Sequence, residues 1–190
     1  MHRKHLVGAA LVALAGLHQG AEAQEGLSSK AHLACEAVLC LSTGSPPGEC
    51  ANALRHYFSI THRRLSETLR RRASFLRLCP VGQQDASMSG LVRIQSQAAG
   101  KCDAEALNAS QRRVTGLGEN DFAIGNRLPA YCDAYFAHAY SDWAHVLPRY
   151  VGVPERGGFW VPAHDHAKAQ GEYAARIVAE DAARNSSAGH

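Results

Sequence analysis

The chain has 190 residues and a formal net charge of +3, which fits a single domain and lacks the strongly basic balance of nucleic-acid-binding proteins. After residue 23, no stretch approaches the run of about eighteen apolar residues that a membrane-spanning helix needs. Composition and charge therefore exclude a strongly basic nucleic-acid binder and a further membrane span.

The first residues have the order of a secretory signal peptide. Arg3 and Lys4 precede an apolar stretch over residues 6–17, and Ala21-Glu22-Ala23 follows as a small-residue cleavage site. At about a dozen residues, the apolar stretch is too short to cross the roughly 30 Å hydrocarbon core of a bilayer. We therefore expect a cleaved signal peptide over 1–23 and a single exported domain over 24–190. A buried N-terminal helix and an uncleaved signal anchor are the alternatives.

The following residues predict a helical first half. Apolar residues at helical spacing indicate helices over about 29–40, 49–60 and 63–78, the first capped by Ser28 or Ser29. Prolines and glycines between residues 41 and 48 separate the first two helices, and Pro80 with Gly82 ends the third. Residues 85–110 are rich in alanine, serine and glutamine, which predicts moderate helix with a break near Gly100.

The predicted helix over 63–78 has the clearest pattern. At 100° per residue, its apolar residues lie on one side and its arginines on the other. The apolar side consists of Leu65, Leu69, Ala73 and Leu76, and the basic side of Arg63, Arg70 and Arg77 flanked by Arg64 and Arg71. This basic side is either a solvated helix face or a docking surface for an acidic partner, lipid head groups or the cell-wall polymer.

The second half has weaker signals. Residues 115–126 contain three glycines and are expected to be loop, and an aromatic-rich segment then runs from Leu128 to Pro148. The aromatic residues between Tyr131 and Trp160 are either core material or the lining of a binding groove. Two β-branched and aromatic runs, 149–153 and 159–161, predict a small hairpin.

A final helix is predicted over about 164–185. We expect it to direct Tyr173, Ala174 and Ile177 towards the body, before a frayed polar tail from about residue 185. The expected fold class is therefore mostly α: a small disulfide-stapled helical domain with one minor β-hairpin.

Six cysteines in an exported chain indicate a disulfide framework. They allow 15 pairings, among which the sequence alone does not choose. In the arrangement that we favour, Cys40 pairs with Cys50 across the proline–glycine break and Cys35 pairs with Cys79. Cys102 and Cys132 remain for the second half. The loops closed in this way, of about 11, 45 and 31 residues, are worth roughly 3, 4 and 4 kcal/mol at most.

No motif predicts catalysis or metal binding. His164-Asp165-His166 is the best local candidate, but side chains two apart on a helix point away from each other, and Asp165 is better explained as a helix cap. Glu49 and Glu67 are available to a cell-wall-cleaving glycosidase, but the arginines around Glu67 are expected to lower its pKa. We therefore expect no catalytic residue, metal or cofactor.

Two blocks of the chain resemble the TrbM family of conjugal transfer proteins. The first contains residues 34–44, 46–50, 55–60 and 72–80, where the spacing of Cys35, Cys40, Cys50 and Cys79 agrees with the apolar pattern. The second contains residues 148–152 and 154–161. The region over 83–127 carries little of the resemblance.

The resemblance implies a small periplasmic accessory of the mating-pair-formation apparatus, a type IV secretion system that moves plasmid DNA between bacteria. The implied partners are protein components of the channel or pilus, without direct contact to nucleic acid, and the implied role is not enzymatic. A periplasmic hydrolase acting on the cell wall and an exported effector or inhibitor are the alternatives.

Overall fold

The computed structural model describes residues 28–116, 118 and 121–188, so the expected signal peptide over 1–23 lies outside the described residues. Within these ranges the chain is a small, mostly α domain, as expected. Its helices are α1 (Ser29–Cys40), α2 (Ala51–Ser59), α3 (Leu65–Leu76), α4 (Ala86–Ala98), α5 (Ala104–Ser110), α6 (Ala130–Phe136) and α7 (His166–Ser187). Two antiparallel hairpins pair β1 (Arg112–Val114) with β2 (Phe122–Ile124), and β3 (Arg149–Val151) with β4 (Phe159–Val161).

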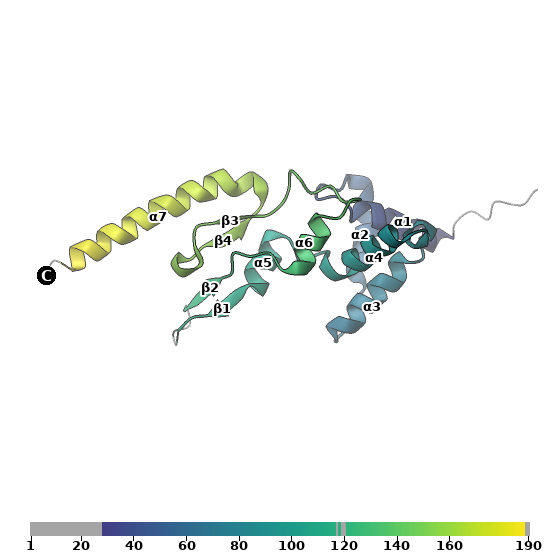
Figure 1. Cartoon of the computed structure of the whole chain (residues 1–190), viewed down its shortest axis with the longest axis horizontal. Coiled ribbons are helices and arrows are strands. Elements are labelled where there is room, and N and C mark those ends of the chain that lie inside the picture. The colour runs from purple at the N-terminus through teal and green to yellow at the C-terminus, as the bar shows by residue number, and fades with distance from the viewer. Residues whose placement is uncertain (1–27, 117, 119–120, 189–190) are drawn as a thin grey trace, which may run out of the picture.

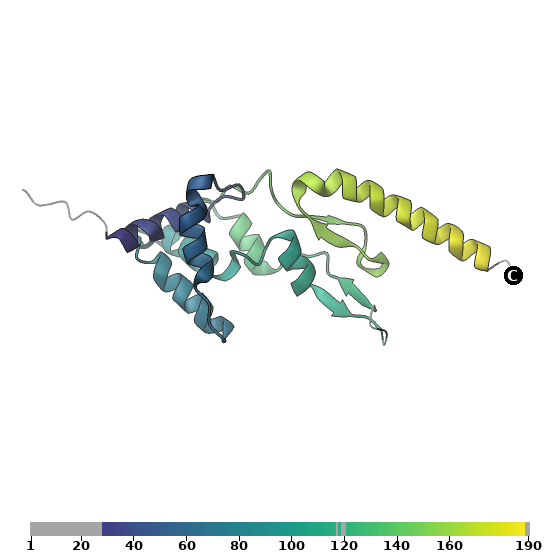
Figure 2. The ribbon, with the colours of Figure 1, turned by 180° about the vertical axis from the view of Figure 1, so that it is seen from behind.

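The molecule is elongated. Helices α1 to α4 gather at one end, with α6 beside them, while the hairpins occupy the middle and α7 forms the other end (Figure 1). The view from behind gives the same arrangement (Figure 2). The two ends of the described chain therefore lie far apart.

Short polar side chains fix where three of the helices begin. The Oγ of Ser28 accepts a hydrogen bond from the Ala31 N–H at 3.2 Å. Asp85 and Asp103 accept equivalent bonds from the third residue that follows each of them, both at 2.8 Å. Each of these oxygens satisfies an N–H that has no partner within its helix, which is worth about 1 kcal/mol.

The helical end has a core built around Tyr57 and Gln95, both fully buried. The Tyr57 hydroxyl donates to the Gln95 backbone carbonyl at 2.9 Å, and the Gln95 side-chain amide donates to the carbonyl of Val38 at 2.8 Å. Burial raises the pKa of Tyr57 to about 12, because the charged phenolate would lose its hydration. These bonds join α1, α2 and α4 into one unit.

Three disulfides link the helical end and the middle of the molecule. Cys40 bonds Cys50, Cys35 bonds Cys79, and Cys102 bonds Cys132. These are the same pairs as in the arrangement that we favoured from the sequence. The first two tie α1 to the start of α2 and to the segment after α3, and the last ties the segment before α5 to α6.

The expectation of loop over 115–126 is wrong at residues 122–124, which form β2 and give the fold a second hairpin. Contacts from distant residues position this strand. The hydroxyl of Tyr150 donates to the Ile124 carbonyl at 2.6 Å, and the indole N–H of Trp160 donates to the Gly125 carbonyl at 2.9 Å. A three-residue strand has too few positions to show a period of two, so local sequence does not reveal it.

The predicted apolar side of α3 is only partly buried. Ala73 and Leu76 are buried, but Leu65 is 60% exposed, which corrects the expectation for that residue. Leu65 is the first residue of α3, at an end of the helix that projects beyond its neighbours (Figure 1). Helical spacing predicts the direction in which a side chain points. It does not predict whether a neighbouring helix is long enough to cover that side chain.

Helix α7 packs on the β3–β4 hairpin around a second small cluster. Val151, Val161 and Ala169 are buried there, with Tyr173 packed against them. Ala174 is exposed, contrary to expectation, because it lies about 100° around the helix from Tyr173. The helix continues through Ser187, past the point near residue 185 where a frayed tail was expected.

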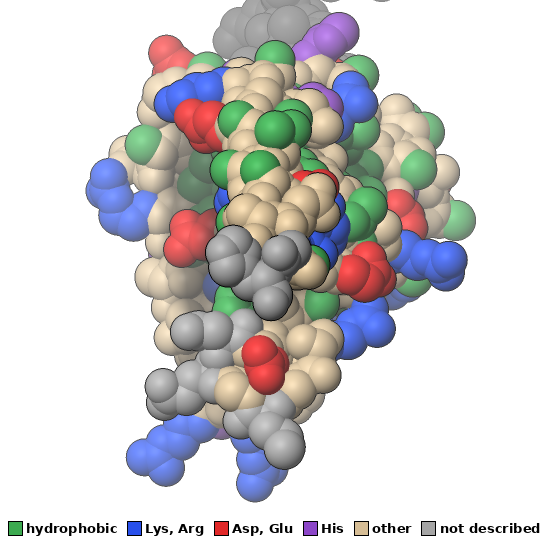
Figure 3. All heavy atoms as spheres, turned by 90° about the vertical axis from the view of Figure 1, so that its left-hand side faces the viewer, with side chains coloured by type: hydrophobic (Ala, Val, Ile, Leu, Met, Phe, Trp, Pro, Cys, Tyr) green, Lys and Arg blue, Asp and Glu red, His purple; other side chains and the backbone are tan. Residues whose placement is uncertain are grey.

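An ion-pair group joins the tip of the hairpin to α7. Arg156, in the turn between β3 and β4, donates to the two carboxylate oxygens of Asp181 at 2.6 and 3.1 Å and to Glu180 at 3.3 Å. Arg176 of α7 donates in return to the Arg156 carbonyl at 2.8 Å. Seen along the molecule from this end, Lys, Arg, Asp and Glu side chains are scattered around the apolar ones (Figure 3).

Candidate interaction surfaces

The five arginines of the basic side predicted for the helix over 63–78 are all exposed. Arg70 and Arg71 lie in the middle of α3, whereas Arg63 and Arg64 precede the helix and Arg77 follows its last residue. The helix is therefore shorter than predicted at both ends. The structure places two of the five arginines on the helix itself and the other three at its ends.

Arg70 is held in place by Glu67. Its Nη2 lies 2.7 Å from one Glu67 carboxylate oxygen, and its Nε donates to both oxygens at 3.3 Å. The hydrogen bond from Arg70, followed by the charges of the nearby cations, holds the pKa of Glu67 below its usual value. This is the direction expected from the sequence for Glu67.

Arg72 is not part of the exposed face, because its side chain turns towards α2. Its guanidinium carbon lies 4.9 Å from the centroid of the Tyr57 ring, and its Nε donates to the Ile60 carbonyl at 3.2 Å. This arginine therefore ties α3 to α2.

Arg70 and Arg71 border a hollow to which the other helices also contribute. Lys30 of α1 and His56 of α2 lie at the same hollow, which has a volume of about 390 Å³. The apolar part of its lining consists of Ile60, Phe75 and Leu78. Sequence reasoning did not single out Lys30 or His56, because only the packing of α1 and α2 against α3 brings them to the arginines.

A second, apolar cleft of about 260 Å³ lies next to the Cys40–Cys50 disulfide. Its lining includes Leu54 and Phe58 from α2, and Phe136, Trp143 and Val146 from the aromatic-rich segment. Of the aromatic residues considered from the sequence, Phe136 and Trp143 thus line a cleft. Tyr135 also lines this cleft, although its side chain is almost fully buried, whereas Trp160 is buried in the core and does not line the cleft.

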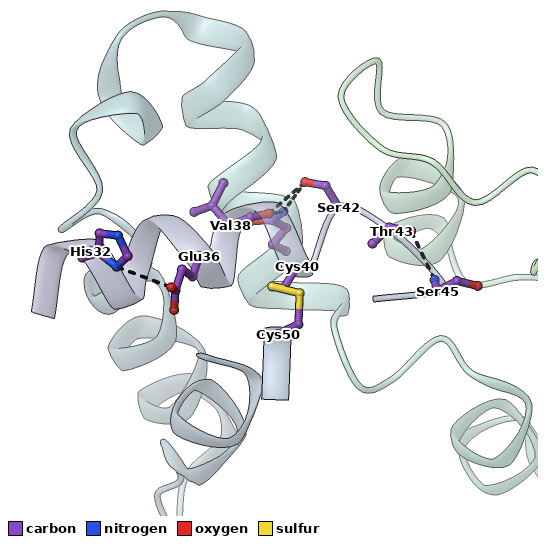
Figure 4. The surroundings of a disulfide bond; sticks show 9 residues. His32, Glu36, Val38, Cys40, Ser42, Thr43, Ser45 and Cys50 are labelled. Carbon is purple, nitrogen blue, oxygen red and sulfur yellow. Dashed lines mark hydrogen bonds and ion pairs between the residues drawn. A yellow bond between two sulfur atoms is a disulfide. The ribbon is translucent and has the colours of Figure 1, made fainter. Parts of the chain in front are cut away.

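Backbone pairing holds the loop after α1 at this cleft. The Asp142 N–H donates to the Ser42 carbonyl at 2.7 Å, and the Gly44 N–H donates to the Asp142 carbonyl at 3.1 Å. Within the loop, the Ser42 hydroxyl bonds the Val38 carbonyl and the Thr43 hydroxyl accepts from the Ser45 N–H, close to the disulfide (Figure 4). The disulfide and these bonds fix one wall of the cleft.

The residues considered for catalysis or metal binding do not converge. His164 and Asp165 are exposed, and the His164 Nε2 lies 3.4 Å from an Asp165 carboxylate oxygen. Asp165 occupies the N-cap position of α7, but its side chain makes no capping hydrogen bond, which corrects the expected role. Among residues 28–116, 118 and 121–188, no three His, Cys, Asp or Glu side chains are grouped as a metal site would need.

Glu49 is exposed in the turn before α2.

In the part of the chain that the structure describes, no helix combines the length and the apolar composition needed to cross a bilayer.

Comparison with known proteins matches the chain to a family model. The model of the family described as TrbM matches residues 27–174, which is most of the chain and includes the region over 83–127. No curated protein and no solved structure matches significantly.

Proposed function

The chain belongs to the TrbM family, and from this premise we propose that it is a periplasmic, non-enzymatic accessory of a conjugative type IV secretion apparatus. Membership of this family implies a role in conjugal transfer. In that role the protein contacts components of the secretion channel or pilus while plasmid DNA is transferred. The family match over residues 27–174 is the observation that carries this proposal.

The disulfides support the periplasmic location. All six cysteines of the sequence are paired, in three bonds that span residues 35–132. Such bonds persist in oxidising compartments such as the bacterial periplasm and are rare in the reducing cytosol. The signal-peptide pattern over residues 1–23 points to the same compartment.

The basic surface around α3 supports a role in protein contact. Arg63, Arg64, Arg70, Arg71 and Arg77 are all exposed there. A cluster of one sign of charge attracts a partner of opposite sign and speeds the encounter.

The environment of Glu67 supports a non-enzymatic role. A glycosidase needs one carboxylic acid with a raised pKa as proton donor. The ion pair with Arg70 lowers the pKa of Glu67 instead, which makes this carboxyl a poor general acid.

Deletion of the gene tests the role in transfer. We expect plasmid transfer to fall strongly in the deletion strain while plasmid replication is unchanged, and the wild-type gene to restore transfer. Transfer at the normal frequency would refute the proposed function. A zymogram on purified cell wall tests the hydrolase alternative. Clearing of the wall material that is lost when Glu49 or Glu67 is substituted would favour that alternative.

Charge reversal tests the contact surface. We expect the triple variant Arg63→Glu, Arg70→Glu, Arg77→Glu to lose crosslinks to partner proteins in mating cells, because repulsion replaces attraction. The matched control reverses Arg93, Arg113 and Arg149, which are exposed on other elements. Equal crosslinking by both triple variants would leave the basic surface without a role in contact.

A further inference from the structure

We propose that the hollow bordered by Lys30, His56, Arg70 and Arg71 binds an acidic segment of a partner protein that carries an apolar side chain among its carboxylates. The inference rests on the proposed function, because it gives the chemistry of the partner that the basic surface around α3 contacts. It also narrows that surface from five arginines to two, and it adds a lysine from another helix.

The cations at the hollow have donors available for carboxylates. No acidic side chain of the described residues lies within ion-pair distance of Lys30 or Arg71. Arg70 uses its Nε and Nη2 for Glu67, which leaves its Nη1 for another acceptor. Charge-assisted bonds from guanidinium to carboxylate are short and roughly twice as strong as neutral ones.

The apolar lining decides against a ligand that is only anionic. Phe75 is buried beneath the ring of His56, at 4.7 Å between ring centroids, and Leu78 stays 41% exposed beside it. Ile60 is half-buried at the same hollow. Covering the exposed parts of Leu78 and Ile60 with an apolar side chain removes them from water, a gain that a bare phosphate cannot provide.

The size of the hollow favours a peptide over a lipid. A volume of about 390 Å³ in a shallow site accommodates a side chain or two and not an extended acyl chain. Binding of this kind follows the usual pattern of interfaces, in which an apolar anchor fills a pocket and a charged rim surrounds it.

Binding of a synthetic peptide to the purified, oxidised protein tests the proposal. The probe is a fluorescent peptide of about ten residues with glutamates on both sides of a central phenylalanine. One control peptide has serine in place of the phenylalanine, and another has glutamines in place of the glutamates. Fluorescence anisotropy is expected to show saturable binding of the probe, with each control at least about tenfold weaker, and no detectable binding of the probe would overturn the proposal.

Two single variants place the binding at the hollow. Arg71→Glu and Lys30→Glu are each expected to weaken binding at least about tenfold, whereas Arg93→Glu, an equal charge change on α4, leaves it within about twofold. Both altered side chains are exposed, and a glutamate at position 30 suits the first turn of α1, so folding is preserved. Thermal unfolding followed by circular dichroism checks this. An equal loss in Arg93→Glu would reduce the effect to net charge and overturn the proposal.

The same variants separate the proposed occupant from other anions. Tighter binding to anionic phospholipid vesicles or to single-stranded DNA than to the probe, lost in Arg71→Glu, would overturn the proposal in favour of that ligand. Salt should weaken probe binding without abolishing it, because the apolar contact is not screened.

Transfer assays distinguish failure of this inference from failure of the proposed function. Arg71→Glu, supplied to the deletion strain, is expected not to restore transfer, whereas Arg93→Glu restores it. Normal transfer in the deletion strain itself would refute the proposed function, whatever the peptide does. If deletion of the gene abolishes transfer and the Arg71→Glu variant fully restores it, only the role of the hollow is refuted.

Discussion

At the scale of single residues, two neighbouring arginines of α3 have different tasks. Arg71 is exposed at the hollow, whereas Arg72 lies against the Tyr57 ring and donates to the Ile60 carbonyl. Their side chains differ in direction by about 100° around the helix, which is enough to leave one exposed to solvent and to pack the other against α2. A basic sequence run therefore does not define a basic face until the packing is known.

This difference predicts different effects on stability. Arg72→Ala should lower the free energy of unfolding by about 1–2 kcal/mol, because a cation–π contact and a hydrogen bond to a carbonyl are lost. Arg71→Ala should change it by less than about 0.5 kcal/mol, as is usual for an exposed residue. Urea unfolding measures both variants, and a similar loss in the two would contradict the structural role of Arg72.

At the scale of elements, α7 depends on the hairpin beneath it for its position. Ala169 is its one buried residue within the described chain, and Arg156 of the hairpin turn supplies polar contacts further along the helix. Such a helix is held by a short apolar contact and a group of ion pairs, which is a weak attachment for 22 residues.

We expect Arg156→Ala to loosen the second half of α7. Amide hydrogen exchange around residues 176–187 should accelerate several-fold while the helical end is unchanged. Arg184→Ala is the control, because Arg184 pairs with Asp181 within the same helix and does not reach the hairpin. Equal exchange in both variants would mean that the contact with Arg156 does not hold the helix.

Acid should act in the same direction as Arg156→Ala. The hydrogen bond from Arg156 lowers the pKa of Asp181 from its usual 3.8, so the folded state favours the charged carboxylate. The stabilising effect of this ion pair is fully present above the usual pKa of an aspartate. It is lost as the pH falls through the lowered pKa of Asp181.

The sequence predicted the helices better than the site. Apolar spacing and capping residues indicated α1 to its ends, because those signals are local. Strand β2 was missed since Tyr150 and Trp160 hold it from far along the chain. For the candidate site, the arginines were visible as a run, but Lys30 joins them only when α1 packs beside α3.

At the scale of the whole molecule, covalent bonds are unevenly distributed. The disulfides span residues 35–132, and the β3–β4 hairpin with α7 lies after the last cysteine. In the chain-entropy model, a link stabilises the fold by restricting the unfolded chain, more so for longer loops.

The double variant Cys102→Ser, Cys132→Ser should therefore lower the free energy of unfolding by up to about 4 kcal/mol. The variant Cys40→Ser, Cys50→Ser, which opens a shorter loop, should cost up to about 3 kcal/mol. Urea unfolding of oxidised protein gives both values. Titration of protein recovered from its native compartment should detect no free thiol; free thiols at most positions would exclude the oxidised framework.

The direction of α7 has a practical consequence for labelling. The helix is about 33 Å long and leads away from the end formed by α1 to α4 (Figure 1). A fluorophore or affinity handle attached after the end of α7 lies far from Lys30 and Arg71, whereas one attached at Ser28, just before α1, lies close to Lys30. Immobilisation through the C-terminal side of α7 therefore leaves the hollow at Lys30 and Arg71 open to solution.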